Sequence, residues 1–385
     1  MFLENVIGPA RPVTWPLRFW PVLVAAFGAS FGATYLCKRI ALKFGIVDEP
    51  DHRVKTHKEP VAYLGGLGML AGFTAAVLAG IAHLSYQPGA GGALIWFLGI
   101  LLGAGIVSCV GLADDLFQIS PAQKIIGQVA AGIILIIVGI VPNLDFLSIP
   151  PLNLRIPFVV NCILQYSIVI IFVVGATNSL NLLDGLDGLC AGVTAIITVA
   201  MFLLAVHLAT WGASATGDPV RIAISLGLIG SVCGFLPFNR HPAKIFMGDA
   251  GSMLLGFVVA ALMILFAEDI PRWWMASVVV FGLPILDTAV AVIRRLLNRR
   301  PLFESDRGHI YDQMIDRGIP LRKTVAICYL LSGFYAVVGV LMSQIRTRYA
   351  VVVYVLVFAV SGLIVSSKGY LKMRGLRGAI RQEDK

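Results

Sequence analysis

Eleven apolar stretches, each about as long as a membrane-spanning helix, are the feature that most limits how this chain can fold. A helix needs about 20 mostly apolar residues to cross a bilayer, and runs of about 18 or more are its signal. The runs lie near 19–40, 63–84, 93–113, 125–142, 158–176, 189–211, 220–236, 251–267, 274–293, 323–343 and 350–367. Only 13% of the 385 residues are charged, whereas soluble domains carry about 25%. The sequence therefore predicts an all-α polytopic membrane protein with about 11 transmembrane helices.

The basic residues predict the orientation of the chain. With the N-terminus outside, 23 of the 30 Lys and Arg fall on the inner side and seven fall outside, as the positive-inside rule requires. We expect one integral membrane domain over 1–367 and a basic cytoplasmic tail over 368–385. Its cytoplasmic loops are expected near 44–62, 114–124, 177–188, 237–250 and 294–322. The loop at 177–188 is the exception, because it contains no Lys or Arg.

The overall composition favours some partners over others. A net charge of +9, mostly on the inner side, suits anionic lipid headgroups and phosphate ligands, and nothing indicates a nucleic-acid module. The six cysteines include no CxxC pair, and the histidines lack zinc-ligand spacing. A Walker loop is also absent from the sequence.

The acidic residues gather on the inner side, where 16 of the 21 Asp and Glu fall. A carboxylate at the end of an apolar run is costly unless it pairs with a cation or faces a polar cavity. A solvated loop surface would explain any one such residue, but a shared site explains the group better. The acids at the ends of apolar runs are Asp114, Asp115, Asp184, Asp187, Asp249 and Asp287.

Asp114 and Asp115 are expected to end one helix, while Lys124 begins the next. Adjacent carboxylates on a helix point in different directions. One of them can therefore face a ligand while the other pairs with Lys124.

The segment from Asn178 to Gly188 is more specific. Asn178, Asn181 and Asp184 recur every three residues, and Asp187 continues the series, so their side chains fall close to one face of a helical or 3₁₀ turn. Carboxylate and amide oxygens are what a hard cation prefers. The stripe therefore predicts a site for a divalent cation.

Asp249 lies between Gly248 and Gly251 at the expected start of a membrane helix. Exposed N–H groups at a helix N-terminus suit a phosphate, and Asp249 is placed to hold a metal that the phosphate brings. An ordinary helix cap is the alternative interpretation of this acid.

Two basic segments complete the candidate site. The first carries Arg53, Lys55 and His57, and the second carries Arg294, Arg295 and His309. Clustered cations beside a metal-type site indicate recognition of a phosphate or diphosphate. Positive-inside anchoring is an equally open explanation for Arg294 and Arg295.

Taken in order, these motifs resemble those of the polyprenyl-phosphate N-acetylhexosamine-1-phosphate transferase superfamily. The resemblance covers about residues 44–316 and rests on six segments. They are Asp48-x-Pro50 with Gly65-Gly66, Asp114-Asp115, Asn178-x-x-Asn181-x-x-Asp184-Gly-x-Asp187-Gly188, the run from Pro242 to Ser252 around Asp249, Pro284-x-x-Asp287, and a late loop with His309.

The resemblance implies that a polyprenyl phosphate attacks a UDP-N-acetylhexosamine and releases UMP, with Mg²⁺ or Mn²⁺ as cofactor. It implies that Asn181 and Asp249 bind the metal and that Asp114 and Asp115 are catalytic. Substrate-binding residues are then Arg53, Lys55, His57, Lys124, Asn178, Asp184, Asp187, Arg294, Arg295 and His309. It also places the protein in the bacterial cytoplasmic membrane with a cytoplasmic active site, and it leaves room for a homodimer.

Several alternatives remain open from the sequence. Asp114 is a general base, a group that positions the acceptor through Lys124, or a nucleophile. The late loop reads His309-Ile-Tyr-Asp312 instead of the His-rich run of many family members. The Ala-Gly-Ser after Asp249 and the expected span count favour the N-acetylglucosamine branch over the peptidoglycan branch. An ion-coupled transporter and a non-catalytic scaffold are the alternatives from other classes.

Overall fold

The computed structural model describes residues 12–49, 60–85, 91–148, 153–211, 214, 216–268, 270–300 and 308–371. Within these ranges the chain is almost entirely helical, and one two-residue antiparallel strand pair joins β1 (Val47–Asp48) to β2 (Val61–Ala62). The helices are η1 (Trp15–Phe19), α1 (Trp20–Phe44), α2 (Gly65–Leu84), α3 (Gly91–Phe117), α4 (Pro121–Ile137), η2 (Asp145–Ser148), α5 (Phe158–Leu183), α6 (Leu189–Thr210), α7 (Gly217–Asn239), α8 (Gly248–Phe266), α9 (Pro271–Val280), α10 (Gly282–Leu297), α11 (Ile310–Asp316), α12 (Leu321–Met342) and α13 (Thr347–Ser367).

The described helices confirm an all-α polytopic membrane protein. Nine of those in the described ranges are long and apolar enough to cross a bilayer, and a tenth span is the bent pair α9 and α10. The eleventh apolar run corresponds to α4, which has only 17 residues. All eleven runs are therefore helical, but the count of eleven crossings and the orientation stay predictions.

A sharp bend divides the apolar run near 274–293 into two helices. α9 ends at Val280, α10 begins at Gly282, and their axes differ by 66°. Proline lacks an N–H group, and its ring collides with the carbonyl group four residues earlier in a helix. Pro284 stands four residues after Val280, so it breaks the helix where α9 ends.

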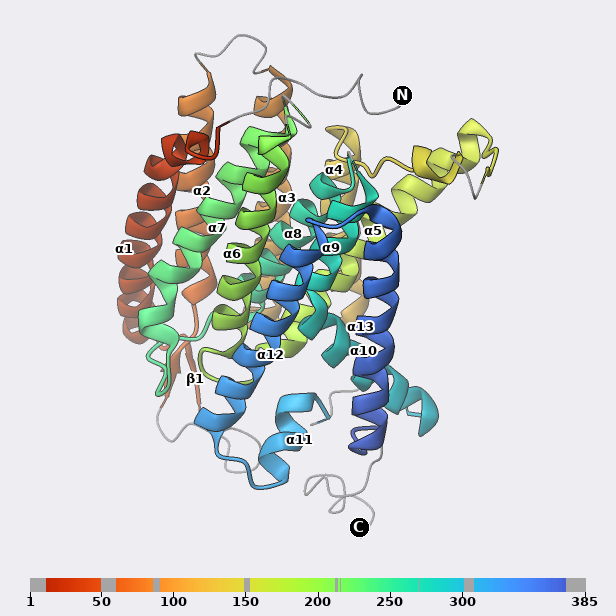
Figure 1. Ribbon diagram of the computed structural model, residues 1–385. Coiled ribbons are helices and arrows are strands. Elements are labelled where there is room, and N and C mark those ends of the chain that lie inside the picture. Colours follow the sequence, from red (N-terminus) through yellow and green to blue (C-terminus); the bar gives the residue numbers. More distant parts are fainter. Residues whose placement is uncertain are drawn as a thin grey trace.

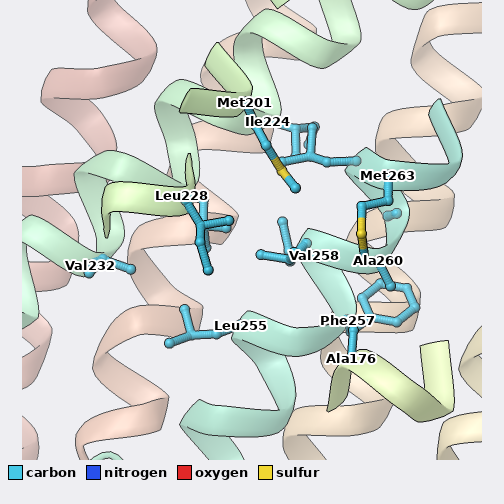
Figure 2. Packing of buried hydrophobic residues seen from close by; sticks show 14 of the residues in the cluster. Ala176, Met201, Ile224, Leu228, Val232, Leu255, Phe257, Val258, Ala260 and Met263 are labelled. Carbon is cyan, nitrogen blue, oxygen red and sulfur yellow. The ribbon is translucent and has the colours of Figure 1, made fainter. Parts of the chain in front are cut away.

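α8 lies in the middle of the bundle and packs against α3, α5 and α2. Of the residues in its most apolar 18-residue stretch, 94% are buried. Protein rather than lipid therefore surrounds this helix. Figure 2 shows the packing on one side of it, where Met201 of α6 and Leu228 of α7 face Val258 and Leu255 of α8. The apolar core thereby fixes the position of α8, whose first turn carries Asp249.

β1 and β2 lie at one end of the bundle, which we call the strand end (Figure 1). α3 and α5 finish at this end, and α4 and α8 begin there. Ala62 of β2 forms a parallel bridge with Ile245, and the Phe246 N–H donates to the Ala62 carbonyl group. The strand pair therefore joins the start of α2 to the segment that leads into α8.

Candidate active site

Lys124 lies between two carboxylates from different helices. Its ammonium Nζ is 2.6 Å from Asp114 Oδ2 on α3 and 2.6 Å from Asp249 Oδ2 on α8. Lys124 itself is in the first turn of α4, which begins with a capping box between Ser120 and Gln123. The structure thus brings together three predicted site residues that are far apart in the sequence.

Asp115 has different partners from its neighbour. Its carboxylate accepts hydrogen bonds from the backbone N–H groups of Asp249 (2.8 Å) and Ala250 (3.2 Å). It therefore caps the N-terminus of α8 from a neighbouring helix, where a negative charge is favourable. We expected these N–H groups to be open to a phosphate, and that expectation is wrong, because Asp115 already occupies two of them.

Gly248 and Gly111 permit this close approach. Gly248 has a φ of +65°, and a Cβ there would collide with the Asp115 carboxylate. A Cβ on Gly111 would lie 2.5 Å from the Ala250 nitrogen. The Gly-Leu-Ala-Asp-Asp segment on α3 therefore seats its two acids directly against the start of α8.

The two asparagines of the stripe lie on α5 as expected and use their amide N–H groups. Asn178 donates to Gln128 Oε1 on α4 (2.8 Å) and to the Val174 carbonyl group. Asn181 donates to Ser252 Oγ on α8 (3.1 Å). These bonds fix both amides so that the Oδ1 atoms remain as acceptors.

Asp184 caps the end of α5, after the last helical residue. Burial raises the pKa of its carboxyl group well above its usual range, and the negative charges of Asp249, Asp115 and Asp187 raise it further. The phenol of Tyr63 responds to the same charges, because burial first and then Asp115 and Asp249 raise its pKa. Negative charge is therefore concentrated here, and a cation would relieve the repulsion.

Asp187 lies in the turn between α5 and α6. One carboxylate oxygen accepts the Ala243 N–H (3.0 Å) and lies 2.8 Å from His241 Nδ1. The next residue, Gly188, has a φ of +75° and donates its N–H to Asn239 Oδ1. Asp187 thus connects the Asn-rich segment to the loop that precedes α8.

His309 and Asp287 form a buried pair. His309 Nδ1 is 2.7 Å from Asp287 Oδ2, and Asp287 Oδ1 accepts the Ile310 N–H at 2.6 Å. Burial lowers the pKa of His309, but the hydrogen bond and charge of Asp287 and the charge of Asp312 outweigh it, so the net pKa is raised. The Asp287 carboxylate accepts from Nδ1–H, which leaves Nε2 of the imidazole for another partner.

Arg294 and Arg295 lie next to this pair on α10, and both are buried. Arg294 donates to the carbonyl group of Gly308, the residue before His309. The positive charge of Arg295 lowers the pKa of His309, against the effect of Asp287. Tyr311 connects this group to the Asn-rich segment, since its hydroxyl donates to the Leu182 carbonyl group at 2.8 Å.

Of the remaining predicted residues, Arg53, Lys55 and His57 lie outside the described residues. Several polar partners were not predicted from the sequence, among them Tyr63, Gln128, Asn239 and Tyr329, whose hydroxyl donates to the Gly188 carbonyl group at 2.6 Å. Each lies in or beside an apolar run and belongs to no repeated pattern of polar residues, so spacing did not distinguish it. Only the position of Tyr63, two residues before Gly65-Gly66, gave a usable signal.

The donor set around Asp249 suits a divalent cation that completes its coordination shell with water and substrate phosphates. In the part of the chain that the structure describes, no three His, Cys, Asp or Glu side chains converge as a complete metal site. Mg²⁺ in phosphate-transfer sites usually takes only one or two carboxylates and completes its shell with water and substrate phosphates. Asp249, the Oδ1 atom of Asn181 and the surrounding excess of carboxylates fit a cation of that kind.

The comparisons with known proteins agree with this chemistry. The family model described as glycosyl transferase family 4 matches residues 97–267. A Bacillus subtilis protein described as a probable undecaprenyl-phosphate N-acetylglucosaminyl 1-phosphate transferase is 33% identical over 81% of this chain and 81% of its own. A decaprenyl-phosphate N-acetylglucosaminephosphotransferase of Mycolicibacterium smegmatis is 30% identical over 80% of this chain and 78% of its own. A phospho-N-acetylmuramoyl-pentapeptide-transferase of Shouchella clausii is 29% identical over 85% of this chain and 97% of its own.

Proposed function

Because the chain belongs to glycosyl transferase family 4, the polyprenyl-phosphate sugar-1-phosphate transferases, we propose that it transfers N-acetylglucosamine-1-phosphate from UDP-N-acetylglucosamine to undecaprenyl phosphate. An oxygen of the lipid phosphate attacks the sugar-linked phosphorus of the donor. The phosphoanhydride bond then breaks, UMP leaves, and the lipid carries a diphospho-sugar. This would be the first membrane step of a cell-envelope polysaccharide.

The convergence of Asp114, Lys124 and Asp249 is the observation that carries the proposal. These side chains come from α3, α4 and α8 and meet at the ends of apolar helices, where a membrane lipid and a water-soluble nucleotide can both arrive. Two anionic phosphates must approach each other in this reaction, so the site has to cancel their repulsion. Lys124 supplies positive charge for one phosphate substrate, and a cation bound by the neighbouring carboxylates would supply it for the other.

A divalent cation, Mg²⁺ with Mn²⁺ as the alternative, is proposed as the cofactor, with Asp249 and Asn181 as its protein ligands. When bound, it neutralises charge on the donor diphosphate and on the departing UMP. Ser252 orients the Asn181 amide through a hydrogen bond. Asp115 holds the first turn of α8, and therefore the backbone of Asp249, in place.

Asp114 is proposed to position the acceptor through Lys124. The lipid phosphate has a second pKa of about 6, so at neutral pH it is already mostly a dianion and does not need a strong base. The 2.6 Å contact between Asp114 and Lys124 supports a positioning role. A general base and a covalent aspartyl-phosphate remain the alternatives that a variant must test.

His309 is proposed as a cationic group for the donor diphosphate. Its neighbours Asp287 and Asp312 favour the imidazolium form, and in that form Nε2–H is a donor for a phosphate oxygen. Asp184 is proposed to face the nucleotide, together with Arg53, Lys55 and His57.

The N-acetylglucosamine branch is preferred over the peptidoglycan branch. The Bacillus subtilis and Mycolicibacterium smegmatis relatives, at 33% and 30% identity, carry N-acetylglucosamine names, whereas the peptidoglycan-type relative from Shouchella clausii is 29% identical. Family membership also sets aside the transporter and scaffold interpretations. We further propose that the strand end faces the cytoplasm of a bacterial inner membrane.

The proposal is tested with the purified full chain in detergent, undecaprenyl phosphate, Mg²⁺ and a panel of UDP-sugars. We expect UMP release with UDP-N-acetylglucosamine that depends on both the lipid and the metal. Release with UDP-N-acetylmuramoyl-pentapeptide instead would favour the peptidoglycan branch. No UMP from any donor would contradict the proposed function.

A further inference from the structure

The ammonium of Lys124 occupies the position between Asp114 and Asp249 that a divalent cation would compete for. Both contacts are 2.6 Å, and the side chains are only about one-fifth exposed, 23% for Lys124 and 19% for each aspartate. Short charge-assisted contacts of this kind are among the stronger polar interactions in proteins. The pair of carboxylates is therefore already neutralised, in part, by a cation of the chain itself.

Two cations cannot share one carboxylate oxygen at these distances without strong repulsion. An ammonium 2.6 Å from Asp249 Oδ2 and a Mg²⁺ about 2.1 Å from the same carboxylate would be like charges in close proximity. Occupation of Asp249 by one of them therefore disfavours the other.

We propose that Lys124 is an internal counter-cation that holds Asp249 in the metal-free protein and gives it up when a divalent cation binds. Lys124 then keeps only Asp114 and presents its ammonium toward the acceptor phosphate. This inference rests on the proposed function for its purpose, but the exchange itself concerns only this chain and a metal ion.

The local structure allows the side chain to move while the backbone stays fixed. The Ser120 N–H and hydroxyl both donate to Gln123 Oε1, and the Gln123 N–H donates back to Ser120 Oγ. This box anchors the first turn of α4. Lysine has four flexible methylene groups, so its ammonium can leave Asp249 without any change in the helix.

The counter-cation also offsets a local excess of carboxylates. Asp115 places a third carboxylate at the start of α8, where it accepts the Asp249 N–H and ties α8 to α3. Lys124 therefore offsets negative charge in the metal-free protein, while the hydrogen bonds of Asp115 keep the backbone of α8 in place.

The first test measures the reactivity of the Lys124 amine in the wild-type protein. The purified full chain in detergent is treated with an amine-acylating reagent with and without Mg²⁺, in the absence of UDP-sugar and lipid phosphate, and labelled lysines are quantified by mass spectrometry. We expect Mg²⁺ to raise labelling of Lys124 several-fold, because one of its two carboxylate partners is lost. Exposed Lys244 is the internal reference and should not change.

The second test measures Mn²⁺ affinity by electron paramagnetic resonance in matched variants. Lys124→Met should bind Mn²⁺ about tenfold more tightly than the wild type, equivalent to about 1.4 kcal/mol, because the competing cation is gone. Lys124→Arg, which keeps the charge, should stay near the wild type. Lys244→Met removes a positive charge elsewhere on the same end and should also stay near the wild type.

Two outcomes would overturn the proposal. One is unchanged or reduced labelling of Lys124 at Mg²⁺ concentrations that compete fully for the Mn²⁺ site. The other is equal or weaker Mn²⁺ binding by Lys124→Met, which would make Lys124 a support for the metal site. Neither test contains substrates, so failure of the UMP assay with success here would reject the function and leave the exchange standing.

Discussion

At the scale of single residues, substitutions of the adjacent acids Asp114 and Asp115 should have different effects on stability and turnover. Asp115 accepts two N–H groups of α8, and loss of a helix cap typically costs about 0.5–2 kcal/mol. Asp115→Ala removes both acceptor oxygens, so it should lower the unfolding midpoint in detergent and lower UMP release with it. Asp114→Asn should keep the wild-type midpoint and UDP-sugar binding but abolish turnover. Wild-type turnover in Asp114→Asn would remove Asp114 from the catalytic residues.

The His309–Asp287 pair predicts a pH dependence. Asp287 and Asp312 raise the pKa of His309 despite the opposing effect of burial. With a raised folded-state pKa, the stabilisation from the imidazolium is complete below the unfolded-state pKa of histidine and is lost as pH rises through the folded-state value. If His309 binds the donor as a cation, kcat/KM should fall over the same alkaline window.

Asp287→Asn is the variant that tests this pH dependence. It removes the charge that raises the pKa of His309 but keeps an acceptor for Nδ1–H. The alkaline limb of the kcat/KM profile should therefore move to lower pH, whereas the profile of Thr288→Ser, on the next residue, should match the wild type. An unshifted limb in Asp287→Asn would mean that another group controls it.

The residues of the candidate site could be predicted where a pattern repeats or where charge is costly. The three-residue spacing of Asn178 and Asn181 placed them on one helix, and acids at the ends of apolar runs stood out in so hydrophobic a chain. The sequence could not predict which of Asp114 and Asp115 pairs with Lys124 and which accepts the N–H groups of α8. That choice depends on how α3 packs against α8. Lys124 was expected to have one carboxylate partner and has two.

At the scale of helices and strands, hydropathy predicted where helices occur but not how they break. The run at 274–293 was expected to be one span, and the structure bends it by 66° between α9 and α10. Pro284 gives the physical reason for the break. The direction that α10 takes after this break depends on its packing against α12 and α5. No local sequence pattern predicts that packing.

The contact between α2 and α8 predicts a strong effect for a single methyl group. A Cβ on Gly66 would lie 2.7 Å from the Gly251 Cα, and backbone atoms cannot rotate away. Overpacking of this kind typically costs about 1–3 kcal/mol, so Gly66→Ala should lower the unfolding midpoint. It should also reduce UMP release by displacing Asp249.

Gly105→Ala on α3 is the matched control for this contact. No atom lies within 4 Å of the added methyl group, and alanine favours helix over glycine, so this variant should be as stable as the wild type or more so. If both variants behaved alike, close packing at Gly66 would not be what positions the first turn of α8.

At the scale of the whole molecule, the candidate site exists only because several distant helices end in the same place. The order of the motifs indicated that they converge, but no distance between them follows from the sequence. The buried central helix α8 provides the fixed reference, and α3, α4 and α5 bring Asp114, Lys124 and Asn181 to its first turn. The charged residues that the sequence assigns to one side of the membrane therefore meet at one end of the helical bundle.

This one-sidedness makes the orientation of the bundle testable. Lys244 is exposed and lies two residues before Phe246, which bonds to β2 at the strand end. Ser148 is exposed in η2, in the segment after α4 that bonds through Asn143 to Ala267, past the far end of α8. In a variant whose six native cysteines are replaced by alanine or serine, Lys244→Cys and Ser148→Cys are treated with a membrane-impermeant maleimide. We expect Ser148→Cys to react in intact spheroplasts and Lys244→Cys to react only after permeabilisation. The reverse pattern would place the site on the outer face, where cytoplasmic UDP-sugars do not reach it, and would contradict both the orientation and the proposed donor.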